Sequence, residues 1–180
     1  MSDGSEVGEV KKLLPVFSAA QLKARVAELG EQLTADYTGR KLLCVGMLNG
    51  AVFFFADLVR EIRMPLQVDF MRVSSYGSGT TGGELHILQD VHTRLTGFDV
   101  LMIEDIVDSG QTMSRIMPLL MGRGARSLKL CALIDKRERR DTEVTIDYTG
   151  FVLDKGFLVG YGLDLAERYR NLPEICEVVL

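Results

Sequence analysis

Three nearly unbroken apolar runs constrain the fold of this chain more than any other feature. They read KLLCVGML at residues 41–48, FDVLMIE at residues 98–104 and SLKLCALI at residues 127–134. Strands that are apolar along their whole length are buried on both faces, as in a parallel sheet that helices cover from both sides. Helical patterns lie between the runs. The sequence therefore predicts an α/β fold with a mostly parallel central sheet flanked by helices.

The remaining elements are predicted from periodicity and breakers. Residues 18–37 carry apolar side chains at helical spacing, and Ser18 with Gln21 fits a capping box at the helix start. Further helices are expected at 52–62, from near Gln111 (where Pro118 should kink the helix or shorten its ladder) and at 165–172. Further strands are expected at 66–74, 84–90, 146–153, 157–164 and 177–180.

The chain shows no internal repeat and no linker. We therefore expect one domain over residues 1–180, with residues 1–12 as a flexible arm and a small lobe built from the two chain ends. The net charge of −4 gives no basic footprint for nucleic acid. No apolar run approaches the roughly 18 residues of a membrane span. The polar N-terminus and three scattered cysteines, two of them in apolar runs, favour a soluble, reducing, cytoplasmic setting.

Ligands of open parallel sheets bind beyond the carboxyl ends of the strands. Three of the predicted strands are followed by polar residues of unusual type. Asn49-Gly50 follows the first apolar run, Glu104-Asp105 and then DSGQT follow the second, and Asp135-Lys136 follows the third. A pocket is predicted where these segments meet.

The DSGQT segment, Asp108 to Thr112, is a turn of small residues that leads into a helix. Such a turn leaves backbone N–H groups unpaired, and its hydroxyls and the helix N-terminus also favour an anion. It is predicted to cradle a monophosphate. The alternative is an ordinary helix cap formed by Asp108 or Ser109. The segment is not a Walker A loop, because the G-x-x-x-x-G-K-[ST] pattern is absent.

The neighbouring carboxylates Glu104 and Asp105 repel each other and need partners. Suitable partners are vicinal ribose hydroxyls, a Mg²⁺ ion or basic side chains, and a structural salt bridge to an arginine is the plain alternative. A diol-binding pair one turn before a phosphate cradle describes a ribose 5-phosphate site.

The segment VLMIEDIVDSGQTM, residues 100–113, resembles the phosphoribosyl-pyrophosphate motif of type I phosphoribosyltransferases, and in particular the hypoxanthine-guanine branch. The likeness extends to residues 44–58, 68–80, 132–140 and 150–173 in the order found in that family, and covers nearly the whole of residues 13–180. It implies the type I phosphoribosyltransferase fold with a small hood lobe.

The resemblance implies a role for each matched residue. Glu104 and Asp105 would bind the ribose hydroxyls, Asp108 would exchange a proton with N7 of the purine, and the loop would bind the 5′-phosphate through Asp108, Ser109, Gly110, Gln111 and Thr112. Lys136 would donate to O6 of the base, Phe157 would stack on it, and the backbone of Leu158 would meet its edge. Pyrophosphate would contact Asn49, Gly50 and Arg170, while Asp164 and Glu104 would contact Mg²⁺. Ser75 and Tyr76 would belong to a lid over residues 75–83.

One position departs from the family pattern. The loop after the first strand often reads Leu-Lys-Gly, with a cis peptide bond before the lysine, whereas this chain has Leu48-Asn49-Gly50. Asn49 supplies no positive charge, so pyrophosphate would be held by backbone N–H groups.

The reaction implied joins a purine base to phosphoribosyl pyrophosphate with Mg²⁺ as cofactor, in purine salvage. The partners implied are these two small-molecule substrates, with no nucleic acid and no membrane, and the family forms homodimers and homotetramers. An adenine or orotate enzyme would lack the matches at Lys136 and at residues 157–164. A regulatory protein of the same fold that responds to nucleotides is the other alternative. A dinucleotide-binding domain is excluded because the G-x-G-x-x-G spacing at residues 77–82 lies between two predicted strands and does not open a helix.

Overall fold

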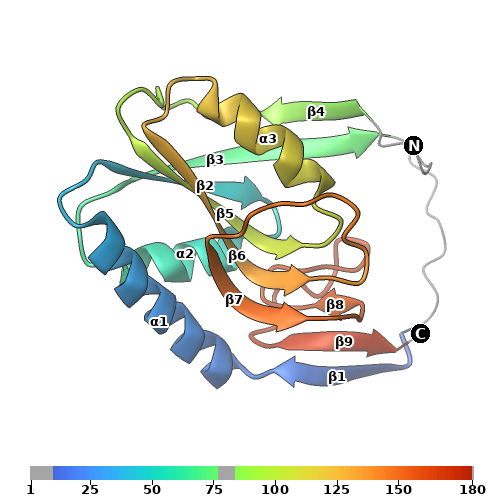
Figure 1. Cartoon of the computed structure of the whole chain (residues 1–180). Helices are drawn as coiled ribbons and strands as arrows, with labels where there is room; N and C mark the ends of the chain where they lie inside the picture. Colours follow the sequence, from blue (N-terminus) through green and yellow to red (C-terminus); the bar gives the residue numbers. More distant parts are fainter. Residues whose placement is uncertain (1–9, 77–83, 180) are drawn as a thin grey trace.

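In the computed structural model, which describes residues 10–76 and 84–179, a six-stranded sheet forms the centre of the molecule (Figure 1). Its order is β4-β3-β2-β5-β6-β7, and every neighbouring pair is parallel except β3 with β4. The strands are β2 (Leu42–Leu48), β3 (Gln67–Tyr76), β4 (Glu84–Gln89), β5 (Asp99–Val107), β6 (Ser127–Lys136) and β7 (Tyr148–Leu153). The predicted mostly parallel sheet is confirmed. The strand predicted at 84–90 is its antiparallel edge strand, β4.

Helices cover both faces of this sheet (Figure 1). The helices α1 (Ala19–Tyr37) and α2 (Val52–Glu61) share one buried cluster with Cys44, Leu101 and Cys131. The helix α3 (Gln111–Met121) shares another with Val45, Met102 and Leu130. Alternate residues of one strand enter opposite clusters, as the two-residue period of a strand requires. This explains why the three central strands are apolar throughout.

The predicted bounds of α1 and α2 and the predicted start of α3 agree with the structure to within one residue. Ser18 accepts a hydrogen bond from the backbone N–H of Gln21, and the Gln21 side chain caps the backbone of Ser18 in return. Helix α3 continues past Pro118 to Met121, and the N–H of Gly122 donates to the carbonyl of Pro118.

The two ends of the chain form a second, three-stranded antiparallel sheet. Its order is β1-β9-β8, with β1 at Lys12–Phe17, β8 at Leu158–Val159 and β9 at Ile175–Val179. This is the predicted small lobe, which we call the hood. The predicted arm, residues 1–12, meets β1 at Lys12, and its residues 1–9 lie outside the described part of the chain.

The helix predicted at residues 165–172 is wrong. This segment forms turns in which Ala166, Glu167 and Tyr169 have positive φ, and Leu165 and Arg168 form an isolated bridge. Contacts across the segment replace the helical ladder: the N–H of Gly162 donates to the carbonyl of Arg170, and the N–H of Glu167 donates to the Asp164 carboxylate. Of the predicted strand at 157–164, only Leu158–Val159 is a strand.

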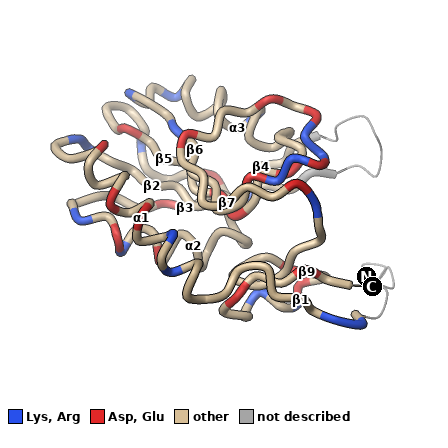
Figure 2. The backbone as a smooth tube through the Cα atoms, turned by 60° about the horizontal axis from the view of Figure 1, so that its bottom comes forward, with Lys and Arg blue, Asp and Glu red and all other residues tan. Residues whose placement is uncertain are grey.

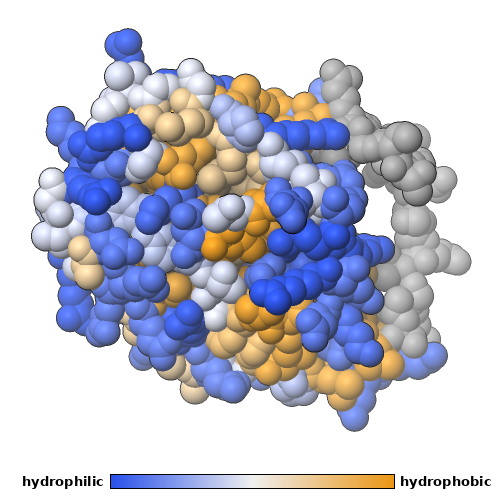
Figure 3. Space-filling model, viewed as in Figure 1, coloured by the Kyte–Doolittle hydropathy of each residue, from blue (hydrophilic) through white to orange (hydrophobic). Residues whose placement is uncertain are grey.

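The cysteines are buried, and the charged residues of both signs are mixed (Figure 2), as expected from the sequence. Cys44, Cys131 and Cys176 are buried free thiols, and burial raises the pKa of Cys44 to about 12. Acidic and basic residues are mixed along the chain (Figure 2), and apolar side chains form separate patches on the face seen in Figure 3. No helix among the described residues is long and apolar enough to cross a membrane.

Candidate active site

The predicted phosphate cradle lies between β5 and α3. Gly110 is the N-cap residue of α3 and has a φ of 85°, and the N–H of Gln111 donates to Ser109 Oγ. A cavity of about 130 Å³ opens here, lined by Glu104, Ile106, Val107, Asp108, Ser109, Gly110, Thr112 and Met113. The side-chain amide of Gln111 instead donates to Asp141, 2.6 Å away. The cavity is small and polar, as a phosphate site requires.

Strand β5 continues to Val107, so the acidic pair lies inside the strand, whereas the sequence predicts that the pair lies at the end of the strand. Burial raises the pKa of Glu104 well above its usual range, and the negative charge of Asp105 raises it further. Burial also raises the pKa of Asp105. Glu104 Oε2 is buried and accepts no hydrogen bond from any residue that the structure describes. A ligand hydroxyl would supply the missing donor.

The turn at Asn49-Gly50 packs directly against this pair. The Leu48–Asn49 peptide bond is cis, as the resemblance implies. A Cβ atom at Gly50 would overlap Asp105 Oδ2, and a Cβ atom at Gly162 would overlap the Gly50 carbonyl. These close approaches require glycine at both positions. They bring the turn after β2, the end of β5 and the segment 160–173 into contact.

Arg170 lies in that segment, beside the Asn49-Gly50 turn. Its guanidinium donates to the Gly162 carbonyl at 2.7 Å and forms an ion pair with Asp164 at 2.8 Å. Its positive charge partly offsets the upward shift of the Asp105 pKa. Arg170 Nε is buried without an acceptor among the described residues. The residues predicted to face pyrophosphate are therefore brought together.

Lys136, at the end of β6, connects the phosphate side to a second cavity. Lys136 is buried, and its Nζ lies 3.4 Å from Asp108 Oδ2. The second cavity has a volume of about 580 Å³ and is lined by Lys136, Glu138, Arg139, Lys155, Gly156, Phe157 and Glu177. The Phe157 ring is half exposed into it, whereas Leu158 is buried. An exposed aromatic ring beside a buried lysine suits a flat base with a carbonyl oxygen.

The carboxylates at this edge of the sheet fit a Mg²⁺ ion that keeps most of its ligands from substrate and water. Mg²⁺ prefers oxygen and is commonly bound through one or two carboxylates plus phosphates. Glu104 offers a buried oxygen without a donor, while Asp164 is engaged by Arg170 and by the N–H of Glu167. Among the described residues no group of three or more side chains forms a closed metal cage.

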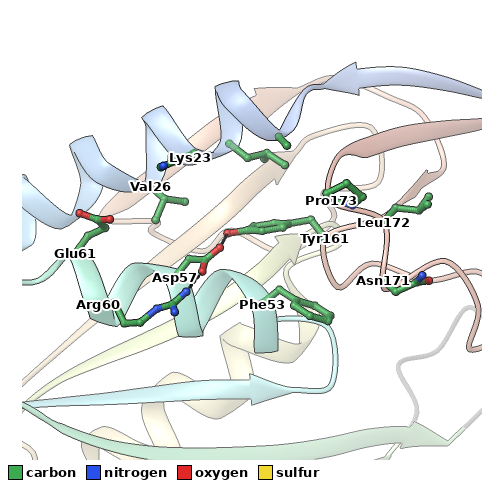
Figure 4. A pocket seen from close by; sticks show the side chains of 12 residues that line it. Lys23, Val26, Phe53, Asp57, Arg60, Glu61, Tyr161, Asn171, Leu172 and Pro173 are labelled. Atoms are coloured by element: carbon green, nitrogen blue, oxygen red, sulfur yellow. Dashed lines mark hydrogen bonds and ion pairs between the residues drawn. The ribbon is translucent and has the colours of Figure 1, made fainter.

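A further cavity of about 480 Å³ lies behind the 160–173 segment, against α1 and α2 (Figure 4). Within it the Tyr161 hydroxyl donates to Asp57 Oδ2 at 2.6 Å, which ties the segment to α2 (Figure 4). The hydroxyl stays protonated, since burial raises the pKa of Tyr161. This contact supports the segment that carries Arg170.

Sequence reasoning missed the support behind the phosphate cradle. Arg140 donates to the carbonyls of Val107 and Asp108, and Asp141 and Thr142 donate backbone N–H groups to the Ser109 carbonyl. The segment DKRERRD reads as a solvated charged loop, and no spacing in it indicates these contacts. Ser75 and Tyr76 end β3, and the rest of the predicted lid, residues 77–83, lies outside the described residues.

Comparisons with known proteins show the family of this chain. The family model for the phosphoribosyl transferase domain matches residues 16–166. The hypoxanthine phosphoribosyltransferase of Salmonella typhimurium is 47% identical over 164 residues, which cover 89% of this chain and 92% of that protein. The bifunctional protein TilS/HprT of Listeria monocytogenes is 48% identical over 168 residues. That match covers 93% of this chain but only 26% of the Listeria protein.

A crystal structure of a hypoxanthine-guanine phosphoribosyltransferase from Bacillus anthracis has the same fold. Its TM-score is 0.89 at 40% identity, covering 95% of this chain and all of that one. Fold, site and comparisons together define the class: the chain belongs to the phosphoribosyltransferase family. Within the family it belongs with the hypoxanthine-guanine branch, to which the segment 100–113 points. The predicted fold and family are confirmed.

Proposed function

We propose that this protein is a purine salvage enzyme that transfers the 5-phosphoribosyl group of phosphoribosyl pyrophosphate to a 6-oxopurine. The products are a nucleoside 5′-monophosphate (IMP from hypoxanthine, GMP from guanine) and pyrophosphate. One observation carries the proposal. The ion pair between buried Lys136 and Asp108 joins the small cavity at the head of α3 to the larger cavity that contains Phe157. A sugar phosphate in the first and a base in the second would meet at this pair.

The reaction forms the bond between C1′ of the ribose and N9 of the purine and breaks the bond between C1′ and the pyrophosphate oxygen. The electron pair of the broken bond leaves with pyrophosphate, and positive charge develops on the ribose ring, as in glycoside chemistry. The proton on N7 of the incoming base then passes to the Asp108 carboxylate, which lies on the Lys136 side of the site.

The other side chains bind and orient the two substrates. Glu104 and Asp105 accept hydrogen bonds from the ribose hydroxyls, and the N–H groups of the cradle hold the 5′-phosphate. Lys136 donates a hydrogen bond to O6 of the base. A 6-amino group would not accept this hydrogen bond. Arg170 and the Asn49-Gly50 backbone face the leaving group. Mg²⁺, when bound, would neutralise charge on the pyrophosphate oxygens.

A spectrophotometric assay with phosphoribosyl pyrophosphate and Mg²⁺ tests the proposal, with hypoxanthine, guanine, xanthine and adenine offered separately. We expect turnover with hypoxanthine, with guanine or with both, none with adenine, and loss of turnover on chelation that added Mg²⁺ restores. Nucleotide binding without turnover of any 6-oxopurine would overturn the enzyme and support the regulatory alternative. Turnover with adenine alone would support the adenine enzyme.

The setting and assembly belong to the same proposal. Three buried free thiols fit a reducing compartment, so we place the enzyme in the cytoplasm. We expect a homodimer or homotetramer, which light scattering on the purified protein tests.

A further inference from the structure

Arg140 sits behind the phosphate cradle, although the sequence around it reads as an exposed charged loop. Its side chain is only 19% exposed, whereas that of Arg139 is 74% exposed. Arg140 Nε donates to the carbonyl of Asp108 at 2.8 Å, and one terminal nitrogen donates to the carbonyl of Val107 at 2.8 Å. The guanidinium is therefore bound to backbone atoms of the cradle.

The next two residues extend this contact along the chain. The backbone N–H groups of Asp141 and Thr142 donate to the Ser109 carbonyl at 3.2 and 3.1 Å. A Cβ atom at Gly110 would overlap the Thr142 carbonyl, so the two segments lie in direct contact there. Three successive carbonyls, that of Val107 and those of the first two cradle residues, are thus engaged by one segment, residues 140–142, which we call the backing segment.

The geometry of the peptide bond fixes the direction in which the neighbouring N–H groups point. In a planar trans peptide the carbonyl and the next residue's N–H point in opposite directions. Among the described residues the only cis bond is Leu48–Asn49. When the carbonyls of residues 107, 108 and 109 point at the backing segment, the N–H groups of residues 108, 109 and 110 point away from it. A row of N–H groups with one orientation forms an anion-binding nest.

Arg140 also ties this nest to the base side of the site. Its terminal nitrogen donates to Asp135 Oδ1 at 2.6 Å and to the carbonyl of Lys136 at 3.2 Å. Asp135 is buried and balances the guanidinium charge. Only the planar fork of arginine provides donors for several such acceptors at once, since lysine presents a single ammonium group.

We propose that Arg140 is a positioning residue: through the backing segment it orients the N–H groups of residues 108–110 toward the 5′-phosphate and holds Lys136 at a fixed place beside them. This inference rests on the proposed function and adds a residue that touches no substrate. If the inference holds, replacing Arg140 weakens recognition of the phosphate more than it lowers the general stability of the protein.

The test measures the contribution of the 5′-phosphate to binding in Arg140→Lys. Calorimetry gives the dissociation constants of inosine 5′-monophosphate and inosine, and the constant of inosine divided by that of inosine 5′-monophosphate isolates the contribution of the phosphate. We expect Arg140→Lys to reduce this ratio about tenfold or more, the size expected when a charge-assisted hydrogen bond is lost. Arg137→Gln is the matched control, because Arg137 contacts the same Asp135 at 3.2 Å, and no hydrogen bond from it to the cradle is seen in the described residues.

An unchanged ratio in a folded Arg140→Lys protein would overturn the inference. Amide resonances of the wild-type protein provide a second test that needs no variant. The N–H groups of Asp108, Ser109 and Gly110 should shift on addition of inorganic phosphate, and three unshifted resonances would also overturn it. Failure of the proposed function is seen separately, as a wild-type protein that binds the monophosphate but turns over no purine.

Discussion

At the scale of single residues, the acidic pair at the end of β5 is arranged for a ligand rather than for the stability of the free protein. Glu104 Oε2 is buried without a hydrogen-bond donor among the described residues, and the Asp105 charge lies beside it. A buried, unsatisfied carboxylate is unfavourable, because neither water nor protein replaces its hydration. Ribose hydroxyls would relieve this in the complex.

Glu104→Gln should therefore stabilise the ligand-free protein at high pH while weakening binding of the sugar donor. Folding raises the pKa of Glu104, so the stability contributed by its protonated form is fully present below the unfolded pKa of about 4.3. The stability due to this form is lost as pH rises through the folded pKa. Glutamine is neutral throughout and avoids this loss.

We expect the melting temperature of Glu104→Gln without ligand to exceed that of the wild type by about 2–4 °C at pH 8, corresponding to roughly 1 kcal/mol. The difference should shrink toward pH 4. Thermal melts at both pH values measure it, with the exposed Glu143→Gln as control. A variant that is less stable than the wild type at pH 8 would contradict this account of the acidic pair.

The role proposed for Asp108 is different, because its carboxylate lies 3.4 Å from Lys136, which lines the larger cavity. Asp108→Asn keeps the size of the side chain but removes the proton acceptor. Turnover should fall by about a hundredfold or more, the usual contribution of general acid–base catalysis, while the KM for phosphoribosyl pyrophosphate stays within about threefold. Steady-state kinetics check this, with Glu143→Gln, an exposed carboxylate outside the cradle and its backing segment, as the control. Full turnover by Asp108→Asn would exclude proton transfer by this residue.

At the scale of elements, the segment 160–173 depends on anchors at its ends rather than on regular structure. The Tyr161 hydroxyl donates to Asp57 on α2, and the N–H of Tyr161 donates to the Leu172 carbonyl at 2.8 Å. Arg170 and Asp164 lie between these anchors. The position of the arginine therefore depends on a contact with α2.

Tyr161→Phe removes this anchor without changing the ring. We expect a rise of about threefold to tenfold in the KM for phosphoribosyl pyrophosphate, because loss of one hydrogen bond to a carboxylate loosens the segment that holds Arg170. The KM for the purine should change little. Tyr169→Phe is the matched control, since no hydrogen bond of its hydroxyl is seen among the described residues. If the two variants raised the KM for phosphoribosyl pyrophosphate equally, this would contradict the anchoring role of Tyr161.

At the scale of the whole molecule, the hood and the main sheet share one core. Leu158, Leu163 and Ile175 of the hood and its adjoining segment belong to the same buried cluster as Phe54 of α2 and Leu101 of β5. Two units with a common core lose their packing together. This supports our proposal that the chain is a single domain.

The three buried cysteines report on this cooperativity without any mutation. Cys176 lies in β9 of the hood, whereas Cys44 and Cys131 lie in β2 and β6 of the main sheet. Pulsed thiol labelling across a urea gradient should give one midpoint for all three, as two-state unfolding requires. Labelling of Cys176 at a clearly lower urea concentration would mean that the hood opens by itself.

The sequence predicts the main sheet well because its central strands are buried on both faces and are apolar throughout. It also predicts that Asn49-Gly50, Glu104-Asp105 and Lys136 meet, since the ends of parallel strands share one edge. The prediction from the sequence fails at residues 165–172. The apolar spacing there fits a helix, but hydrogen bonds involving Gly162 and Asp164 hold the segment in turns. The prediction also fails at Arg140, whose partners are backbone carbonyls that no residue pattern reveals.

The central claim is that the end of β5 and the head of α3 form one site for a ribose 5-phosphate. Calorimetry with inosine 5′-monophosphate and its 2′,3′-dideoxy analogue, on wild type and on the double variant Glu104→Gln/Asp105→Asn, tests it most directly. The account predicts that the wild type binds the analogue at least about tenfold more weakly, and that the double variant binds both ligands equally. Equal binding by the wild type, or a difference that persists in the double variant, would contradict it.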